Sequence, residues 1–267
     1  MKNLKVNRIL FIVAFFFLLG YSRNPSQNVN WQIHVEMGIP QDNSLSDDFL
    51  IFRKQYVLSY NKDKCVTNWV SWNLNSSWFG DVPRFKGNFI TDPNLPNNFC
   101  RAKHKDYTNS GYDKGHIVRS EERTNTAENN KATFILTNVI PQARDLNRGP
   151  WLALERYCEV LCKKNYKELY IIAGGIYHTS KKVNKKITIP DSCFKIIVIL
   201  DKGKKSASVN SKTQIISVAM PNINGIRNAD WHTYISTVDR IEYSTGYNFL
   251  NKIPEPLQSK LEKKKFK

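Results

Sequence analysis

The stretch DYTNSGYDKGHIVRS, residues 106–120, places a single histidine, His116, directly after Gly115 and before a short extended piece, IVRS. Four residues such as DKGH occur more often in ordinary turns than in functional sites. An imidazole with an ordinary pKa of about 6.5 is nevertheless suited to take a proton at neutral pH. The segments that flank the stretch decide whether His116 is a turn residue or a catalyst.

The segments after the histidine predict a polar loop, a strand and a helix. EERTNTAENNK (121–131) is polar, as in a surface loop, and ATFILTNVI (132–140) has the length and apolar content of a buried strand. Within residues 141–165 apolar side chains recur at helical spacing, and Pro150 is suited to the first turn. The amphipathic positions are Trp151, Leu154, Cys158, Leu161 and Cys162.

Two motifs taken together, SGYDKGH (110–116) and TNVIPQARDLNRGPWLALE (137–155), resemble the DNA/RNA non-specific endonuclease family. That family carries a ββα-metal finger with a DRGH motif, a strand ending in Asn before a PQ pair, and a helix bearing Asn and Glu. The runs YVLSY, WVSW and VDRIEYSTGY extend the resemblance over about residues 50–257. It implies an α+β fold, with a mixed or antiparallel central sheet flanked by helices and a ββα-metal finger as the active site.

The resemblance implies that His116 is the general base and that Asn147 is the metal ligand. Phosphodiester hydrolysis needs a deprotonated water and a cation that absorbs charge on the phosphorus oxygens and the leaving group. A neutral amide oxygen suits a hard Mg²⁺ ion that keeps most of its waters, with Mn²⁺ as a substitute. An asparagine beside a helix start is also a common cap, and the two uses are compatible.

Further site residues follow from the same resemblance. Glu155 is expected to act through a metal-bound water, against the alternative of an ordinary surface ion pair. Asn138 is expected to orient the phosphate or the histidine loop, and Arg84 to clamp a phosphate unless it is a generic surface arginine. Lys114 stands where the family has arginine, so the charge is kept without the planar fork, and activity is expected with an altered rate or preference. Asp113 is expected to pair with a neighbouring cation.

The rest of the chain predicts one sheet-rich domain. The hairpin FRKQYVLSY to CVTNWVSWNL opens it, residues 73–111 form a long loop region, and DWHTYISTVDRIEYSTGYNF predicts a helix and a turn. Three continuous apolar runs, KELYIIAGGIY, FKIIVILD and TQIISVAMP, predict central strands covered on both faces. The expected boundaries are 1–22 for a signal peptide or signal anchor, 23–48 for a linker or surface arm, 49–257 for the endonuclease domain and 258–267 for a basic tail.

Charge and cysteine usage describe a basic, exported chain. The formal net charge is +17, which favours a polyanionic partner, although a lysine-rich composition alone has the same effect. A basic start and an apolar run from Ile9 to Leu19 are typical of a secretory signal and too short for a comfortable membrane span. Five cysteines permit up to two disulfides and leave one thiol over, and zinc is disfavoured.

The sequence therefore predicts an exported, Mg²⁺-dependent endonuclease that cuts DNA and RNA and, by resemblance, leaves 5′-phosphate ends. It would be secreted, periplasmic or on the cell surface, with a membrane contact only through an uncleaved anchor and no small-molecule cofactor. The alternative is a surface nucleic-acid binding or uptake protein with weak or lost catalysis. A second alternative is a nuclease toxin or a mitochondrial-type nuclease of the same family. This alternative would be expected to carry an amphipathic, Arg-rich presequence, and the N-terminal segment does not have that pattern. No protein inhibitor can be identified from the sequence.

Overall fold

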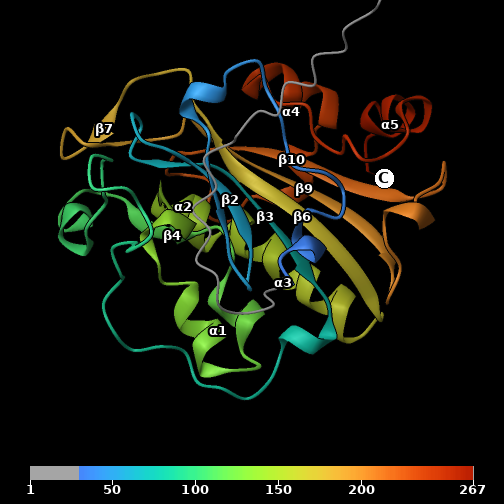
Figure 1. The fold of residues 1–267 in the computed structure, drawn as a ribbon, viewed down its shortest axis with the longest axis horizontal. Helices are drawn as coiled ribbons and strands as arrows, with labels where there is room; N and C mark the ends of the chain where they lie inside the picture. Colours follow the sequence, from blue (N-terminus) through green and yellow to red (C-terminus); the bar gives the residue numbers. More distant parts are fainter. Residues whose placement is uncertain (1–29, 267) are drawn as a thin grey trace, which may run out of the picture.

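A six-stranded antiparallel sheet organises the chain, of which the computed structural model describes residues 30–266 (Figure 1). The strand order is β1-β2-β3-β6-β9-β10. The strands are β1 (Phe49–Phe52), β2 (Val57–Asn61), β3 (Val66–Leu74), β6 (Lys167–Ile176), β9 (Ser192–Asp201) and β10 (Gln214–Pro221). The predicted hairpin is β2 and β3, and the three apolar runs are β6, β9 and β10. The predicted fold class, α+β with an antiparallel central sheet, is confirmed.

Helices cover both faces of this sheet. Alternate residues of β6 enter different hydrophobic clusters, because side chains of a strand alternate between faces. Leu169 and Ile171 join the cluster that contains Leu154 of α3 (Pro150–Lys163), and Tyr170 joins the cluster that contains Val238 of α4 (Val238–Thr245). Figure 1 accordingly shows α3 on one side of the sheet and α4 with α5 (Glu255–Glu262) on the other. The continuous apolar strands are explained by burial on both faces.

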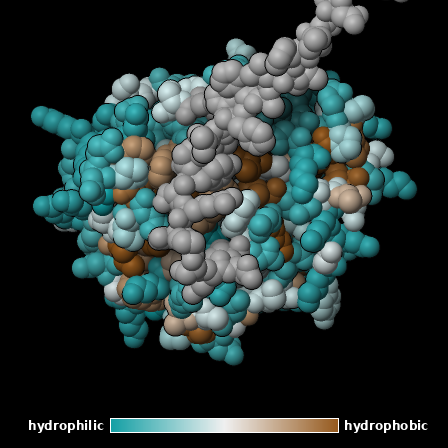
Figure 2. Space-filling model, viewed as in Figure 1, coloured by the Kyte–Doolittle hydropathy of each residue, from teal (hydrophilic) through white to brown (hydrophobic). Residues whose placement is uncertain are grey.

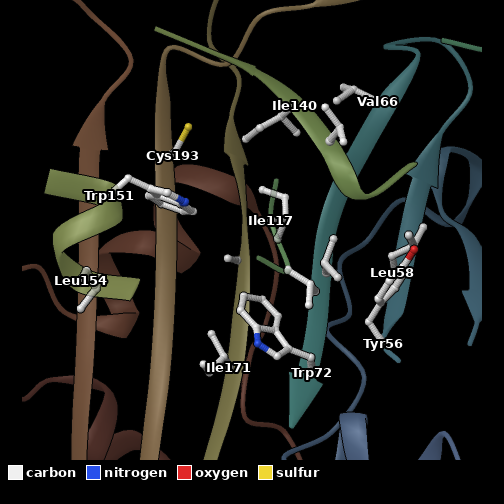
Figure 3. Close-up of a cluster of buried hydrophobic side chains, with 14 of the residues drawn as sticks. Tyr56, Leu58, Val66, Trp72, Ile117, Ile140, Trp151, Leu154, Ile171 and Cys193 are labelled. Atoms are coloured by element: carbon white, nitrogen blue, oxygen red, sulfur yellow. The ribbon is translucent and has the colours of Figure 1, made fainter. Parts of the chain in front are cut away.

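The expected ββα finger is formed by β4 (Asp113–His116), β5 (Val139–Gln142), α2 (Arg144–Arg148) and α3. Strands β4 and β5 pair antiparallel, with His116 opposite Val139. Gly115 leaves room for the buried side chain of Gln142 in β5, because a Cβ at Gly115 would lie 2.1 Å from Oε1 of Gln142. Figure 3 shows Trp151 and Leu154 of α3 packed in the layer that also contains Trp72 of β3. Burial of a side chain such as Leu154 contributes about 1.5–3 kcal/mol.

Between β4 and β5 the structure differs from the prediction. The predicted strand 132–140 is wrong, since α1 (Ala127–Ala132) ends there, a 3₁₀ turn follows at Leu136–Asn138, and only β5 is extended. The predicted surface loop 121–131 is also wrong, because Glu122 and Arg123 are buried and α1 is capped by the Thr126 side chain. The IVRS piece is not extended, since the strand precedes it. The apolar residues of this segment are buried without forming a strand. Side-chain hydrogen bonds, such as those of Asn138 to Val118 and Thr133, hold the segment in place of strand pairing.

The two ends of the described chain pack against the domain more closely than the predicted surface arm and charged tail would. Nδ1 of His34, which is buried, accepts a hydrogen bond from the backbone of Asn73 in β3. Segment 258–267 begins inside α5, where Leu261 is buried. Tyr234 lies in a separate 3₁₀ turn (Trp231–Tyr234) rather than in α4, which ends at Gly246 in the left-handed conformation. The predicted signal segment 1–22 lies outside the described residues.

The cysteines form fewer cross-links than the number permits. Cys65 and Cys100 are joined by a disulfide, which ties the turn between β2 and β3 to the long loop region. Cys158, Cys162 and Cys193 are buried thiols. Of the two expected uses of Cys158 and Cys162, packing fits their burial, and pairing to a distant cysteine does not occur. No helix within residues 30–266 is long and apolar enough to cross a membrane.

The surface is largely hydrophilic on the face drawn in Figure 2, where hydrophobic residues occur in scattered groups. Large exposed hydrophobic side chains among the described residues include Tyr166 and Tyr243. Scattered apolar residues of this kind are normal for a folded protein. The visible part of this face therefore gives no reason to seek the functional site in an apolar patch.

Candidate active site

A cleft of about 730 Å³ opens beside the finger. It brings together five of the six predicted site residues, all except Asn138. Its charged lining residues are Arg84, Asp113, Lys114, Arg119, Glu121, Arg144, Arg148, Glu155 and Arg156, and His116, Asn147, Phe89, Tyr107 and Leu152 also line it. His116 from β4 and Asn147 from α2 therefore face one shared space.

His116 presents a neutral ring to this cleft. The ring packs against Phe89, with 5.0 Å between ring centroids, and against Phe134, at 4.9 Å and edge-on, and the two phenylalanine rings also contact each other at 5.1 Å. Burial, together with the nearby Arg84 guanidinium, lowers the pKa of His116 to about 3. Nε2 is buried and has no hydrogen-bond partner within residues 30–266. A neutral imidazole with a free nitrogen can accept a proton from a group that enters the cleft.

Asn147 is held by Asp113 of the neighbouring strand. Its Nδ2 donates a hydrogen bond of 2.9 Å to Oδ2 of Asp113, which leaves the amide oxygen available. Arg148 donates to both oxygens of Asp113, at 2.8 and 2.9 Å. Burial alone raises the pKa of Asp113, but the hydrogen bonds from Arg148 and Asn147 outweigh it and lower the pKa below its ordinary value. Asp113 is thus a permanent anion that pairs with a cation, as expected, and also orients the amide.

Glu155 lies on α3 in a different environment. Its side chain is only 7% exposed, and its oxygens lie 3.6 Å from Nζ of Lys195 and 3.8 Å from Nε of Arg119. Burial raises the pKa of Glu155 to about 7, although Lys195 acts in the opposite direction. The alternative of an ordinary surface ion pair is excluded, because both Glu155 and Lys195 are buried. Glu155 is a carboxylate that changes charge near neutral pH.

Behind Glu155 a buried charge network continues into the sheet. Lys195 of β9 is 1% exposed, and its Nζ lies 4.1 Å from the ring centroid of Trp151. Trp72 of β3 donates a 2.9 Å hydrogen bond to the buried carboxylate of Glu122. Lys195 also lowers the otherwise raised pKa of Glu122. Lys195 therefore offsets charge on both buried carboxylates, together with Arg119 beside Glu155 and Arg123 beside Glu122.

Arg84 and Lys114 both line the cleft near His116, Arg84 beside Phe134 and Lys114 beside Phe89. Nη1 of Arg84 donates to the Ser120 hydroxyl and, at 3.0 Å, to Oε1 of Glu121. Nζ of Lys114 lies 5.7 Å from the ring centroids of Phe89 and Tyr107 and forms no ion pair in the described chain. Both residues line the cleft as positive charges.

Asn138 holds the backbone that follows His116 and does not line the cleft. Its Oδ1 accepts from the backbone nitrogen of Val118 at 2.9 Å, and its Nδ2 donates to the carbonyls of Val118 and Thr133 at 3.0 and 2.9 Å. Its side chain is fully buried. Of the two expected functions, positioning of the histidine loop fits these contacts, and contact with a phosphate does not.

Several residues of the site were not predicted. Arg119 contacts Glu121 at 3.0 Å and Glu159 at 3.3 Å in addition to Glu155. Lys195 completes the charge balance from a strand forty residues beyond Glu155. Arg119 and Glu121 lie only three and five residues after His116, and this closeness in sequence is the one signal from which they could have been predicted. For Lys195 the sequence carries no comparable signal, because a lysine in a strand is ordinarily exposed.

Comparison with known proteins gives a consistent assignment. The family model described as DNA/RNA non-specific endonuclease matches residues 36–255. A nuclease of Nostoc sp. (strain PCC 7120 / SAG 25.82 / UTEX 2576) is 40% identical over 242 residues, which cover 90% of this chain and 87% of that protein. A mitochondrial nuclease of Saccharomyces cerevisiae is 28% identical over 222 residues, covering 76% of this chain and 65% of that protein.

A solved structure of the EndoG/EndoGI complex, concerned with the mechanism of EndoG inhibition, is similar in fold. Its TM-score is 0.71 at 25% identity, over 88% of this chain and 96% of that chain. The family match spans the central sheet and the whole finger, including the segments that carry His116 and Asn147. The chain belongs to the DNA/RNA non-specific endonuclease family, and it is a nuclease.

Proposed function

We propose that this protein is an exported, Mg²⁺-dependent endonuclease that cuts DNA and RNA with little sequence preference and uses His116 as its general base. The observation that carries the proposal is the shared cleft of His116 and Asn147. One side chain offers a buried nitrogen without a partner, and the other offers an amide oxygen beside it in the same space.

The side chains of the cleft fit a hard divalent cation. The amide oxygen of Asn147 is left free by the Asp113 contact, and Glu155 supplies a carboxylate in the same cleft. Oxygen donors of this kind suit Mg²⁺, with Mn²⁺ as a substitute. Asn147 would hold the ion directly and Glu155 through water, and the bound ion would stabilise negative charge on the phosphate and leaving oxygens. The two groups of three acidic side chains elsewhere in the described chain do not line this cleft.

The protein's own residues divide the rest of the reaction. His116 takes the proton of the attacking water, since its ring is neutral and Nε2 is free. Arg84 and Lys114 hold phosphate oxygens in the cleft, Arg84 through a guanidinium and Lys114 as a point charge. Asn138 keeps the backbone after His116 in place. The bond from phosphorus to the 3′ oxygen breaks, which leaves a 5′ phosphate.

Low sequence preference follows from the composition of the cleft. Its lining is dominated by cationic side chains, which are directed to phosphates. Phosphate contacts fix the position of a nucleic acid and carry no sequence information. The net charge of +17 adds a sequence-independent attraction for DNA and RNA alike.

Export is supported by two features of the chain. The first 22 residues have the basic start and apolar run of a secretory signal. The Cys65–Cys100 disulfide suits an oxidising compartment. Expression of the full chain with and without residues 1–22, followed by assay of medium, periplasm and membrane, tests this part of the proposal. Retention of both forms in the cytoplasm would contradict it.

The catalytic part is tested by a metal titration on supercoiled DNA and on RNA, with wild type and His116→Ala run side by side. Wild type should digest both substrates with added Mg²⁺ and neither with EDTA. The variant should lose about 10²–10⁴-fold in rate. It should retain DNA binding in a gel-shift assay with EDTA. Binding without metal-dependent digestion by wild type would instead identify a nucleic-acid binding protein.

A further inference from the structure

The charges of the cleft are unequally paired. Four of its six cationic side chains form ion pairs with its three carboxylates. These pairs are Arg84–Glu121, Arg119–Glu121, Arg119–Glu155, Arg144–Asp113 and Arg148–Asp113. The two cations left over are Lys114 and Arg156. Lys114 faces aromatic rings beside His116, so Arg156 is the one whose surroundings give it no evident structural task.

Arg156 is exposed and forms no hydrogen bond or ion pair in the part of the chain that the structure describes. It nevertheless lines the cleft. An arginine that binds an incoming phosphate usually breaks its existing ion pair first, which offsets part of the gain. Arg156 has no such pair to break, and its planar fork fits two oxygens of one phosphate.

Arg156 directly follows Glu155 on α3, but the two side chains leave the helix in directions about 100° apart. Glu155 is buried, whereas Arg156 is exposed and so lies toward the solvent side of the cleft. Leu152, one helical turn earlier, lines the cleft on the same side. Successive phosphates of one strand in duplex DNA advance by about 3.4 Å along its axis. A nucleic acid held at His116 and Asn147 would thus present a different phosphate to Arg156.

We propose that Arg156 binds a substrate phosphate other than the one that is cleaved, and so makes the enzyme favour polymeric nucleic acid over an isolated phosphodiester. The proposal rests on the function proposed above. Arg156 is a substrate-binding residue with no part in the chemical step. Its loss should therefore raise KM for DNA and RNA and leave kcat unchanged.

The test uses Arg156→Ala and Arg156→Lys in the full chain, with Lys163→Ala as the matched control. Lys163 lies on the same helix, carries the same charge and does not line the cleft. Binding of a 20-base-pair DNA duplex is measured against salt concentration in EDTA, so that no cleavage is needed. Turnover is measured with Mg²⁺ on the same duplex and on bis(4-nitrophenyl) phosphate, which has one phosphodiester.

Arg156→Ala should weaken DNA binding about tenfold and reduce the slope of log K against log salt by about one. Arg156→Lys should keep the slope, and Lys163→Ala should change neither quantity. Turnover of bis(4-nitrophenyl) phosphate should be the same in all four proteins. An unchanged slope in Arg156→Ala, or an equal loss in Lys163→Ala, would overturn the proposal. Absence of metal-dependent turnover by wild type would instead count against the proposed function, and the binding measurement would still decide the role of Arg156.

Discussion

Two of the three carboxylates that line the cleft, Asp113 on β4 and Glu155 on α3, differ in what surrounds them. Asp113 accepts hydrogen bonds from Arg148 and Asn147, and its pKa is lowered. Glu155 is buried beside Lys195 at 3.6 Å, and burial raises its pKa to about 7. Direct hydrogen bonds thus fix one side as an anion, while burial leaves the other able to change charge. Asp113 therefore orients the Asn147 amide, whereas the charge of Glu155 depends on pH near neutrality.

Removal of Lys195, the lysine buried behind Glu155, should have the largest effect of the changes considered, and it should appear in the free energy of unfolding. Lys195→Met removes the buried cation that faces both Glu122 and Glu155, with Arg119 remaining beside Glu155 at 3.8 Å, and breaking a buried pair costs about 3–5 kcal/mol. The free energy of unfolding, measured by urea denaturation, should fall by that amount. Lys167→Met is the control. Lys167 also forms an ion pair, at 2.6 Å from Asp201, but Asp201 is exposed, and exposed pairs contribute little to stability, so the urea midpoint should stay nearly unchanged. Equal stability of the two variants would remove the distinction between buried and exposed pairs.

Glu155→Gln should lower the rate of metal-dependent DNA digestion by about 100-fold, because outer partners of a metal site contribute on that scale. The variant should also lose a pH dependence. In wild type the carboxylate gains its charge as pH rises through about 7, so activity should rise over the same interval and fall below it. Rates at pH 5.5 to 8.5 check this. A wild-type profile that is retained by Glu155→Gln would assign the titration to another group.

Asp113→Asn should cost about tenfold in rate, at the lower end of the range for residues that orient a ligand. The neutral amide no longer anchors Arg148, and it holds Asn147 less firmly. Because the pKa of Asp113 is already low, this loss should be independent of pH above about 5. A loss that grows with pH would show that the Asp113 side also changes charge in the working range.

Lys114→Arg should change kcat/KM for DNA by about threefold or less, upward, since the charge is kept and the planar fork is added. The ratio of DNA to RNA turnover shows whether the lysine alters substrate preference. Lys114→Ala is the companion variant and should lose more than Lys114→Arg gains. A large fall in Lys114→Arg would mean that the aromatic pair Phe89 and Tyr107 accepts only lysine.

Much of the fold could be predicted because burial on two faces leaves a plain pattern. Strands β6, β9 and β10 are continuous apolar runs, and α3 shows its helical period directly. The segment between β4 and β5 could not be predicted in the same way. Its shape depends on polar contacts such as Asn138 to Val118 and Thr133, which an apolar count does not detect.

The site shows the same division. His116, Asn147 and Glu155 were predicted through the resemblance of their motifs to the endonuclease family, and the fold brings them to one cleft. Lys195 was missed, because its burial depends on partners from α3 and from the Glu122 turn, remote in sequence. Asn138 was predicted to orient either the phosphate or the histidine loop. Its hydrogen bonds to the backbone after His116 favour the loop, and these bonds cannot be read from the sequence. Charge balance within a core is a property of the folded chain.

The central claim is that His116 and Asn147 act on one phosphate in one step, and a double-mutant cycle tests it most directly. The rate of Mg²⁺-dependent digestion of supercoiled DNA is measured for wild type, His116→Ala, Asn147→Ala and the double variant. Groups that act as a unit give non-additive losses, so the double variant should be about as slow as the slower single variant. Multiplication of the two single losses in the double variant would contradict the claim.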